Sequence, residues 1–304
     1  MDQSLPLDTN DIAPPLPTDV PFRILRPVTQ TTPVVFASPH SGREYPLNFL
    51  ECARLDATGL RRSEDCFVDE LFEGALDAGA PLMSAMFARA YCDPNREKWE
   101  LDPAMFVDAL PDWVNTTSAR VGAGLGTLAR VVASGESIYR RKLSFGEAEF
   151  RVQTYWEPYH AALGRLLDET KRMFGACLLV DCHSMPAQRL SAGRTSPDIV
   201  LGDAHGTACS PAIMRTAEHI LTDLGFRVRR NDPYAGGYVT RHYGRPRELI
   251  HAIQVELARE LYMDEIRLLP LPDFAAVQHK LARFAARLCE SAPELLGIAT
   301  RPRR

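Results

Sequence analysis

The sequence contains no long apolar run, no Cys-x-x-Cys pair and no large excess of charge of either sign. No run approaches the roughly 20 apolar residues that a membrane span needs, and the amino terminus lacks the basic-then-apolar layout of a signal peptide. The seven cysteines are odd in number and scattered, which argues against a disulfide framework and against a sulfur-ligated zinc. These absences predict a protein of the reducing cytoplasm.

Charge and composition limit the kinds of partner that the protein is expected to bind. A net charge of −4, with no extended basic cluster, gives no reason to expect a nucleic acid or a membrane as partner. A hydrophobic fraction of 45% and a charged fraction of 24% are typical of a globular protein. We expect a Pro-rich, disordered leader at 1–20 and a single α/β domain at 21–304, with a loop insertion around 94–127.

Apolar runs and helical periodicity alternate along the chain. The pattern predicts strands at 33–38, 81–87, 89–92, 178–181, 198–201, 226–230 and 250–257, and helices at 47–56, 63–78, 144–174, 211–224 and 272–290. Such alternation indicates a mainly parallel, mixed sheet flanked by helices on both faces. Ligands bind at the carboxyl ends of the strands in a sheet of this kind.

Two predicted strands each end in a histidine that is followed by serine. The segment 38–42 reads Ser-Pro-His-Ser-Gly and the segment 181–184 reads Asp-Cys-His-Ser. His40 and His183 could therefore meet at one edge of the sheet. Neutral imidazole is a common zinc ligand, and a catalytic zinc usually takes three protein ligands and a water. The plainer alternative is that each histidine only makes hydrogen bonds within its turn.

A third ligand would be a carboxylate or another histidine. Glu64 and Asp65 open a predicted helix shortly after the first strand, where the helix dipole also stabilises negative charge. The dipole alone explains both acids, and their spacing does not choose between them. His205, in a turn after a later strand, is a weaker candidate because a fourth protein ligand would close the site to water.

Several further residues are candidates for substrate binding or proton transfer. Arginine offers a planar fork of donors that matches a carboxylate, although a lone arginine in a loop is usually a solvated charge. Glu256 lies within an otherwise apolar strand, where a carboxylate needs a partner or has a raised pKa. Either state suits a general base, and a structural salt bridge is the competing interpretation. The candidates for substrate binding are Asn95, Arg96, Arg241 and His242, and Arg89 is a candidate for catalysis with Glu256.

Together these stretches resemble the N-formylglutamate amidohydrolases. The resemblance extends from about residue 33 to 265 and is most specific after residue 236. The segments that carry it are 38–42, 64–65, 68–69, 93–96, 181–184, 236–246, 251–257 and 262–265.

The resemblance implies a zinc-exopeptidase-like α/β fold and a cytoplasmic hydrolase that converts N-formyl-L-glutamate to formate and glutamate in histidine degradation. It implies zinc ligands at His40, at His183 and at Asp65 or its neighbour Glu64. Glu44, which could imitate a His-x-x-Glu ligand pair, is one residue too far along and ranks below Asp65.

The resemblance also assigns roles in catalysis. It implies that Glu256 is the general base and that Asn95 and Arg96 bind a substrate carboxylate. We expect Arg89 to help stabilise the oxyanion, and Arg241, with its neighbour His242, to assist in binding the substrate.

Three alternatives remain open at this point. The enzyme could act on another N-acyl amino acid, such as N-formylaspartate, or on a small peptide. The protein could be a non-catalytic binder of acidic metabolites, although its two histidines and Glu256 argue against this. A serine hydrolase using Ser41 or Ser184 is a further rival, but neither serine lies in a Gly-x-Ser-x-Gly elbow.

Overall fold

The computed structural model describes residues 20–187 and 196–298, so nearly all of the predicted leader lies outside the described residues. Seven strands form the main sheet in the order β1-β3-β2-β4-β7-β5-β6. The strands are β1 (Phe22–Leu25), β2 (Val34–Ser38), β3 (Leu82–Ala85), β4 (Cys177–Met185), β5 (Ile199–Gly202), β6 (Val228–Arg230) and β7 (Ile250–Ala258). A separate small hairpin joins β8 (Met263–Asp264) to β9 (Leu269–Pro270).

The four central strands, β3, β2, β4 and β7, run parallel to one another. At one edge β1 pairs antiparallel with β3, and at the other β5 pairs antiparallel with β7 and parallel with β6. The expectation of a mainly parallel, mixed sheet is confirmed. The carboxyl ends of the central strands therefore lie along one edge, where a site is expected.

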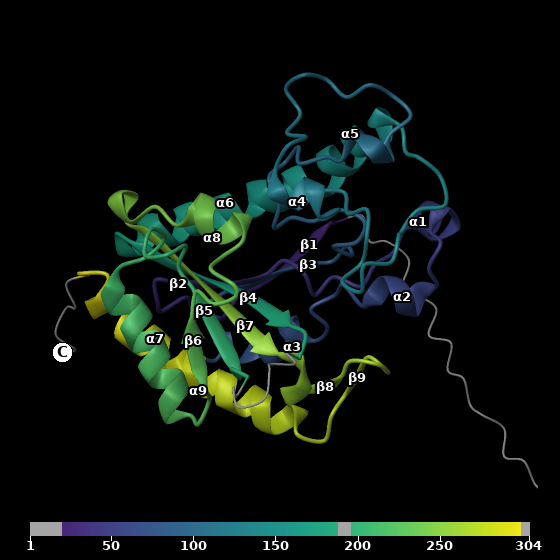
Figure 1. Ribbon diagram of the computed structural model, residues 1–304. Helices are drawn as coiled ribbons and strands as arrows, with labels where there is room; N and C mark the ends of the chain where they lie inside the picture. The colour runs from purple at the N-terminus through teal and green to yellow at the C-terminus, as the bar shows by residue number, and fades with distance from the viewer. Residues whose placement is uncertain (1–19, 188–195, 299–304) are drawn as a thin grey trace, which may run out of the picture.

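Helices cover both faces of the sheet (Figure 1). Alternate side chains of β4 point to opposite faces: Leu178 and Val180 pack in one apolar cluster, and Cys177 and Leu179 in another. The first cluster includes α7 (Pro211–Asp223) and α9 (Phe274–Leu295), and the second includes α6 (Glu157–Phe174). The remaining helices are α1 (Leu47–Cys52), α2 (Ala57–Arg61), α3 (Val68–Leu71), α4 (Ala119–Gly122), α5 (Phe145–Arg151) and α8 (Tyr238–Tyr243).

The predicted helix at 63–78 is wrong in its extent. Only α3 and a 3₁₀ turn at Glu73–Ala75 are helical there. The backbone N–H of Asp65 donates to the carbonyl oxygen of His40 at 3.0 Å, and Phe67 has a left-handed backbone with φ of 64°. A side chain rarely adopts that conformation, so the chain turns before the helix begins. The apolar spacing continues into α3, but the first residues of the predicted helix form a turn at the edge of the site.

Other differences from the expected elements are smaller. Residues 89–92, predicted as a strand, form a turn in which the N–H groups of Tyr91 and Cys92 donate to the carbonyl oxygen of Ala88. The predicted helix at 144–174 is found as α5 and α6 joined by a π-helical turn at Val152–Trp156. Its amino end carries a capping box between Ser144 and Glu147.

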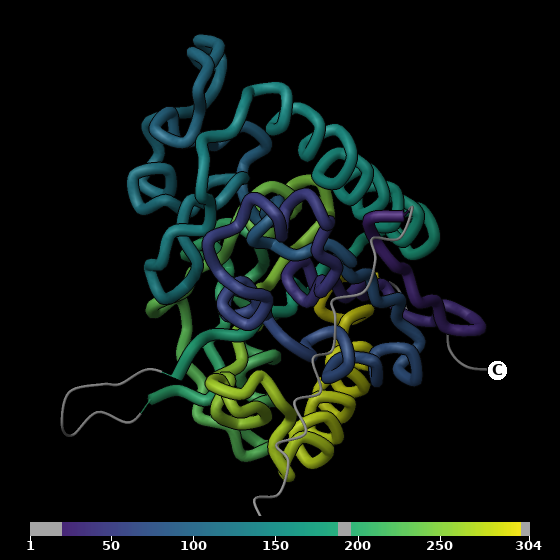
Figure 2. The backbone as a smooth tube through the Cα atoms, turned by 90° about the vertical axis from the view of Figure 1, so that its right-hand side faces the viewer, coloured from purple at the N-terminus to yellow at the C-terminus, as the bar shows by residue number. Residues whose placement is uncertain are grey.

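The segment 94–127, expected to be a loop insertion, carries little regular structure apart from α4 and a 3₁₀ turn at Pro103–Met105. Figure 2 shows the blue loops of this part of the chain projecting beyond the sheet. Its residues Leu101 and Phe106 pack in a small apolar cluster with Leu128 and Leu143, which follow the segment in the chain. The division into a leader and one domain stays a prediction. Among the helices of the described residues, none is long and apolar enough to cross a membrane.

Candidate metal centre and substrate pocket

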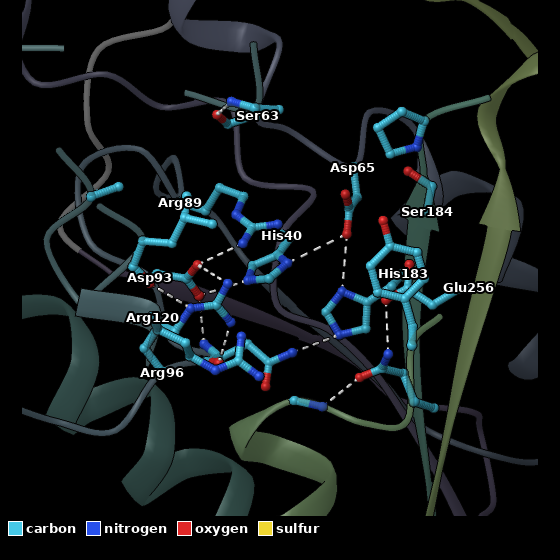
Figure 3. A pocket seen from close by; sticks show the side chains of 18 of the residues that line it. His40, Ser63, Asp65, Arg89, Asp93, Arg96, Arg120, His183, Ser184 and Glu256 are labelled. Carbon is cyan, nitrogen blue, oxygen red and sulfur yellow. Dashed lines mark hydrogen bonds and ion pairs between the residues drawn. The ribbon is translucent and has the colours of Figure 1, made fainter. Parts of the chain in front are cut away.

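A cavity of about 490 Å³ opens at the carboxyl ends of the central strands (Figure 3). Its walls come from the turns that follow β2 and β3, from the ends of β4 and β7, from the 94–127 segment and from the loop before α8. The histidines and the acids sought from the sequence meet here. The lining includes His40, Asp65, Arg89, Asn95, Arg96, His183 and Glu256.

Strand register explains why the groups from β4 and β7 share one side of the sheet. The two strands are parallel neighbours, with His183 opposite Glu256 and Asp181 opposite Gln254. Residues two apart on a strand point to the same face, so all four side chains lie on one face. Each strand end thus delivers two polar side chains to the pocket edge.

His40, Asp65 and His183 form a compact group whose possible ligand atoms all lie within 4.8 Å of one another. The Asp65 Oδ2 atom is 2.9 Å from Nδ1 of His183 and 3.4 Å from Nδ1 of His40. All three side chains are buried. A carboxylate facing two imidazole nitrogens is a donor set that zinc and similar divalent ions accept.

The other nitrogen of each histidine ring is held by a carboxylate. Nε2 of His40 lies 2.7 Å from Asp93 Oδ1, and Nε2 of His183 lies 2.9 Å from Asp181 Oδ1. Because a carboxylate only accepts, an Nε2 that faces one is placed to carry the hydrogen, and a neutral ring with this tautomer would offer its Nδ1 lone pair to a metal ion. Carboxylate partners of this kind orient metal-binding histidines.

A metal ion between the two Nδ1 atoms and Asp65 would satisfy all three groups. Nδ1 of His40 is buried and has no hydrogen-bond partner among the described residues. Burial alone would raise the pKa of Asp65, but the neighbouring rings of His183 and His40 lower it well below its usual range. An ionised carboxylate beside an unpaired buried nitrogen fits a metal ion, because such an ion would pair with both atoms.

The structure separates Asp65 from Glu64. Glu64 points away from the histidines and accepts hydrogen bonds from the hydroxyl of Tyr45 at 2.5 Å and from Nε of Arg61 at 3.2 Å. Glu44 is also buried, but it is not part of the histidine group. The structure brings Asp65 alone of these three acids to the two histidines, and consecutive residues on a turn cannot both point there.

Arg259 holds the carboxylate of Asp65 in place through the oxygen that does not face the histidines. Nη2 of Arg259 lies 3.0 Å from its Oδ1 atom, and the other donors of this arginine bond to Ser184 Oγ and to the carbonyl oxygen of Arg62. With its donors used in this way, Arg259 orients Asp65 and links β7 to the turn before α3. Sequence reasoning missed this residue, because a single arginine directly after a strand has no distinguishing pattern.

Glu256 lies on the wall of the pocket beside His183 (Figure 3). One of its oxygens accepts a hydrogen bond from Gln254 Nε2 at 2.8 Å. It makes no salt bridge with any described residue, so the salt-bridge interpretation finds no support. Burial raises the pKa of Glu256 to about 7, against the opposing charge of His183. A carboxylate with a pKa in this range can both accept and return a proton.

Of Arg89 and the predicted substrate-binding residues, the structure brings some to the pocket and leaves others outside. Arg89 lines the cavity and donates to Asp93 Oδ2 at 2.7 Å. Asn95 and Arg96 also line it. Arg241 and His242 do not: both are exposed on α8, where Arg241 donates to the carbonyl oxygen of Gly236 and His242 stacks on a tyrosine ring. Helix α8 turns both side chains outward.

Neither candidate serine is paired with a histidine. The Ser41 hydroxyl bonds to Ser38 and accepts from the backbone N–H of Asp69, and Ser184 accepts from Arg259. A serine nucleophile needs a neighbouring base to take its proton. His205, the weaker metal candidate, lies in an exposed turn and does not line the pocket. The structure therefore gives no support to the serine-hydrolase rival.

Helix α6 and the turn before it support the backbone between Asp93 and Arg96. Nε1 of Trp156 donates to the carbonyl oxygen of Arg96 at 3.1 Å, and Nε2 of His160 lies 2.8 Å from the carbonyl oxygen of Pro94. Burial lowers the pKa of His160 to about 3, so this ring is neutral and is a donor at Nε2. It is a buried structural histidine.

Gly237 is required where the pocket loop crosses Asn95. A Cβ atom at this position would lie 2.2 Å from Asn95 Nδ2, an atom that itself lies 3.0 Å from Nε2 of His183. Gly237→Ala is expected to displace Asn95 and lower kcat/KM about 10-fold or more, as loss of outer support does in metal sites. Gly164→Ala on α6 meets nothing within 4 Å and serves as the control. Steady-state rates and thermal unfolding check both variants, and full activity in Gly237→Ala would contradict the packing argument.

Comparison with known proteins agrees with this geometry. The model of the N-formylglutamate amidohydrolase family matches residues 32–263, which includes all the residues placed around the cavity. The chain belongs to the N-formylglutamate amidohydrolase family. The members of this family are amide hydrolases, and the resemblance read from the sequence is confirmed.

Individual relatives extend the comparison. The N-formylglutamate deformylase of Pseudomonas putida is 31% identical over 241 residues, covering 77% of this chain and 82% of the relative. The N-formylglutamate deformylase of Pseudomonas aeruginosa is 30% identical over 240 residues, covering 77% and 83%.

Solved structures agree as well. The crystal structure of an N-formylglutamate amidohydrolase from Ralstonia eutropha aligns with a TM-score of 0.85 at 35% identity, over 90% of this chain and 99% of that one. A gene product of Agrobacterium tumefaciens aligns with a TM-score of 0.62 at 16% identity, over 90% of this chain and 96% of that one, and shares the fold.

Proposed function

We propose that this protein hydrolyses the formyl C–N bond of N-formyl-L-glutamate to give formate and L-glutamate. One observation carries the proposal: a buried His-Asp-His group lies in the same pocket as Glu256. The relatives from the two Pseudomonas species are named N-formylglutamate deformylase, which supports this choice of substrate. We further propose that the reaction serves histidine degradation in the cytoplasm.

We propose zinc as the ion, held by His40, Asp65 and His183. Zinc favours two imidazole nitrogens and one carboxylate oxygen with an open position for water or substrate. The lone pairs that Asp93 and Asp181 leave on the two Nδ1 atoms support this assignment. When bound, such an ion acidifies water and polarises a carbonyl oxygen.

Glu256 is proposed as the general base and acid. It takes a proton from the attacking water as the new C–O bond forms at the formyl carbon. It then delivers that proton to the amide nitrogen as the C–N bond breaks, so that glutamate leaves with a neutral amine. A carboxylate whose pKa is near neutrality suits both steps.

Arg89 is proposed to stabilise negative charge that develops on the formyl oxygen. It lines the cavity, and its charge is among the influences on the pKa values of both His40 and Glu256. One nitrogen of the guanidinium donates to Asp93, and the other donors are without a partner among the described residues. Preorganised donors of this kind stabilise a transition state without reorganising.

Arg96 remains a proposed substrate-binding residue together with Asn95, but most of its donors are already used. Nε donates to the carbonyl oxygen of Leu125 and Nη1 to that of Asn95, each at 2.8 Å. We therefore propose that Arg96 acts on the substrate mainly through its charge.

The experiment that tests the proposed function measures the release of formate by the purified metal-loaded protein. N-Formyl-L-glutamate should be hydrolysed with a higher kcat/KM than N-formyl-L-aspartate, N-acetyl-L-glutamate or a formylated dipeptide. A higher value for any of these would move the assignment to that substrate. No turnover in the whole set, with tight binding of glutamate derivatives, would favour a non-catalytic binding protein.

A further inference from the structure

The pocket contains a positively charged side chain that takes no part in the metal group or in the proposed acid–base chemistry. Arg120 lies on the short helix α4 within the 94–127 segment and lines the cavity. Figure 3 shows it on the side occupied by Arg96 and Asp93, across the pocket from Glu256. The segment that looked like a loop insertion in the sequence therefore reaches into the substrate pocket.

Arg120 differs from the other arginines of the lining in having no partner. Arg259 is bonded to Asp65, Ser184 and a carbonyl oxygen, Arg96 to two carbonyl oxygens, and Arg89 to Asp93. Within the described part of the chain, the guanidinium of Arg120 makes no hydrogen bond or ion pair. All its donors are available to a ligand.

The backbone that carries this side chain is nevertheless held in place. The Ser118 side chain caps α4 by accepting from the N–H of Val121, and the carbonyl oxygen of Arg120 accepts from Leu125. The carbonyl oxygen of Leu125 in turn accepts from Arg96 Nε. Arg96 thus fastens the segment that carries Arg120 to the edge of the pocket.

The positive charge of the arginines at this end of the pocket favours the binding of an anion. The charge of Arg120, together with that of Arg89, opposes the charge of Arg96, whose pKa burial and these neighbours lower to about 10. Asp93 is the one carboxylate of the described pocket lining that pairs with these arginines. Asp93 and the buried Glu100 offset part of the charge of Arg96, whereas Arg120 has no carboxylate partner among the described residues and can attract a further anion.

We propose that Arg120 binds the side-chain carboxylate of the substrate and makes the pocket selective for acidic N-formyl amino acids. This inference rests on the proposed deformylase function and assigns the residue that reads the side chain. Arg89 acts near His40 and Glu256, where the amide reacts. Arg120 lies at the Arg96 side of the pocket, which suits the far end of a glutamate side chain. A guanidinium with free donors can bind that carboxylate through two parallel bonds.

The test compares the wild-type protein with Arg120→Gln, Arg120→Lys and the control Arg215→Gln, all metal-loaded. Arg215 is exposed on α7, away from the pocket lining. The substrates are N-formyl-L-glutamate and N-formyl-L-glutamine, whose side chain is a neutral amide and which keeps the α-carboxylate. We expect Arg120→Gln to lower kcat/KM for the acid by about 10- to 100-fold, mainly through KM, because one charged hydrogen-bonding interaction is lost.

Arg120→Gln should leave kcat/KM for N-formyl-L-glutamine unchanged. The preference for N-formyl-L-glutamate over N-formyl-L-glutamine should therefore be lost. Arg120→Lys should restore part of it, and Arg215→Gln should match wild type. An equal loss on both substrates would show that Arg120 only supports the fold, and an unchanged preference would overturn the proposal.

A binding measurement keeps this inference separate from the proposed reaction. Calorimetric titration with glutarate, a dicarboxylate without an amide, should show affinity about 10-fold or more weaker in Arg120→Gln than in wild type. Butyrate, which has one carboxylate, should bind the two proteins alike. If wild type releases no formate but loses glutarate binding on substitution, the deformylase assignment fails and the Arg120 assignment stands. If glutarate binds both proteins equally, the Arg120 assignment fails.

Discussion

Replacing Glu256 with glutamine is expected to lower kcat for N-formyl-L-glutamate by about 10²- to 10⁴-fold, the range that general acid–base catalysis supplies. Glutamine keeps the shape of the side chain and its hydrogen bonding to Gln254, but it cannot take a proton from water. KM should change little, because the substrate is bound mainly by the arginines. Steady-state kinetics on the metal-loaded protein check this expectation.

Stability measurements distinguish this role from a structural one. Glu256 is buried near Asp65 and Asp181, whose charges raise its pKa further, and it has no salt bridge among the described residues. Removing its charge should therefore leave the free energy of unfolding unchanged or higher. Glu260→Gln, at an exposed position four residues later, is the matched control and should behave like wild type. A Glu256→Gln variant that is destabilised and yet fully active would contradict the assignment.

The second large effect is expected at the third metal ligand. Asp65→Asn should lower the affinity for zinc by at least about 100-fold and abolish formate release, because a neutral amide replaces the one carboxylate among the described residues that groups with both histidines as a possible ligand. Glu64→Gln should retain a full equivalent of metal, since its carboxylate points to Tyr45 and Arg61. Metal content after dialysis, measured by mass spectrometry, compares the two variants directly.

These neighbouring substitutions also control for each other. Both remove one buried negative charge from the same turn, and both can reduce stability, so thermal unfolding is measured alongside metal content. Metal loss in Glu64→Gln with retention in Asp65→Asn would reverse the assignment of the ligand. Equal metal content in both variants would place the carboxylate ligand elsewhere.

The strand ends of the site could be predicted from the sequence because two simple rules act there. A short apolar run that ends in a polar turn indicates a buried strand, and parallel strands put their carboxyl ends along one edge. His40, His183 and Glu256 follow from these rules. The side-by-side placement of His183 and Glu256 could not be predicted in this way. It depends on the register between two strands, and the two residues are 73 positions apart in the sequence.

The turn between Glu64 and Phe67 shows where periodicity misleads. The apolar positions fit a helix from residue 63, but tertiary contacts draw Asp65 toward His40 and impose a left-handed backbone at Phe67. Which of two adjacent acids faces inward is then decided by that turn. Local spacing holds no information about it.

The outward position of Arg241 and the inward position of Arg120 have a similar origin. Both lie in stretches with glycine and polar residues, and the sequence pointed to Arg241 as a substrate-binding residue but gave no signal for Arg120. Arg241 is on α8 and turns to solvent, whereas Arg96 and Ser118 fix the short helix that carries Arg120 against the pocket. The decisive bonds join residues of separate turns, so they became visible only once the chain was folded.

The most direct test of the whole account is the release of formate from N-formyl-L-glutamate before and after removal of metal. The protein as purified should carry about one equivalent of divalent metal per chain and release formate and glutamate in equal amounts, in keeping with one three-ligand site. Dialysis against a chelator should abolish this activity, and added zinc should restore it in wild type but not in Asp65→Asn. Undiminished formate release by protein shown to contain no metal would contradict the account.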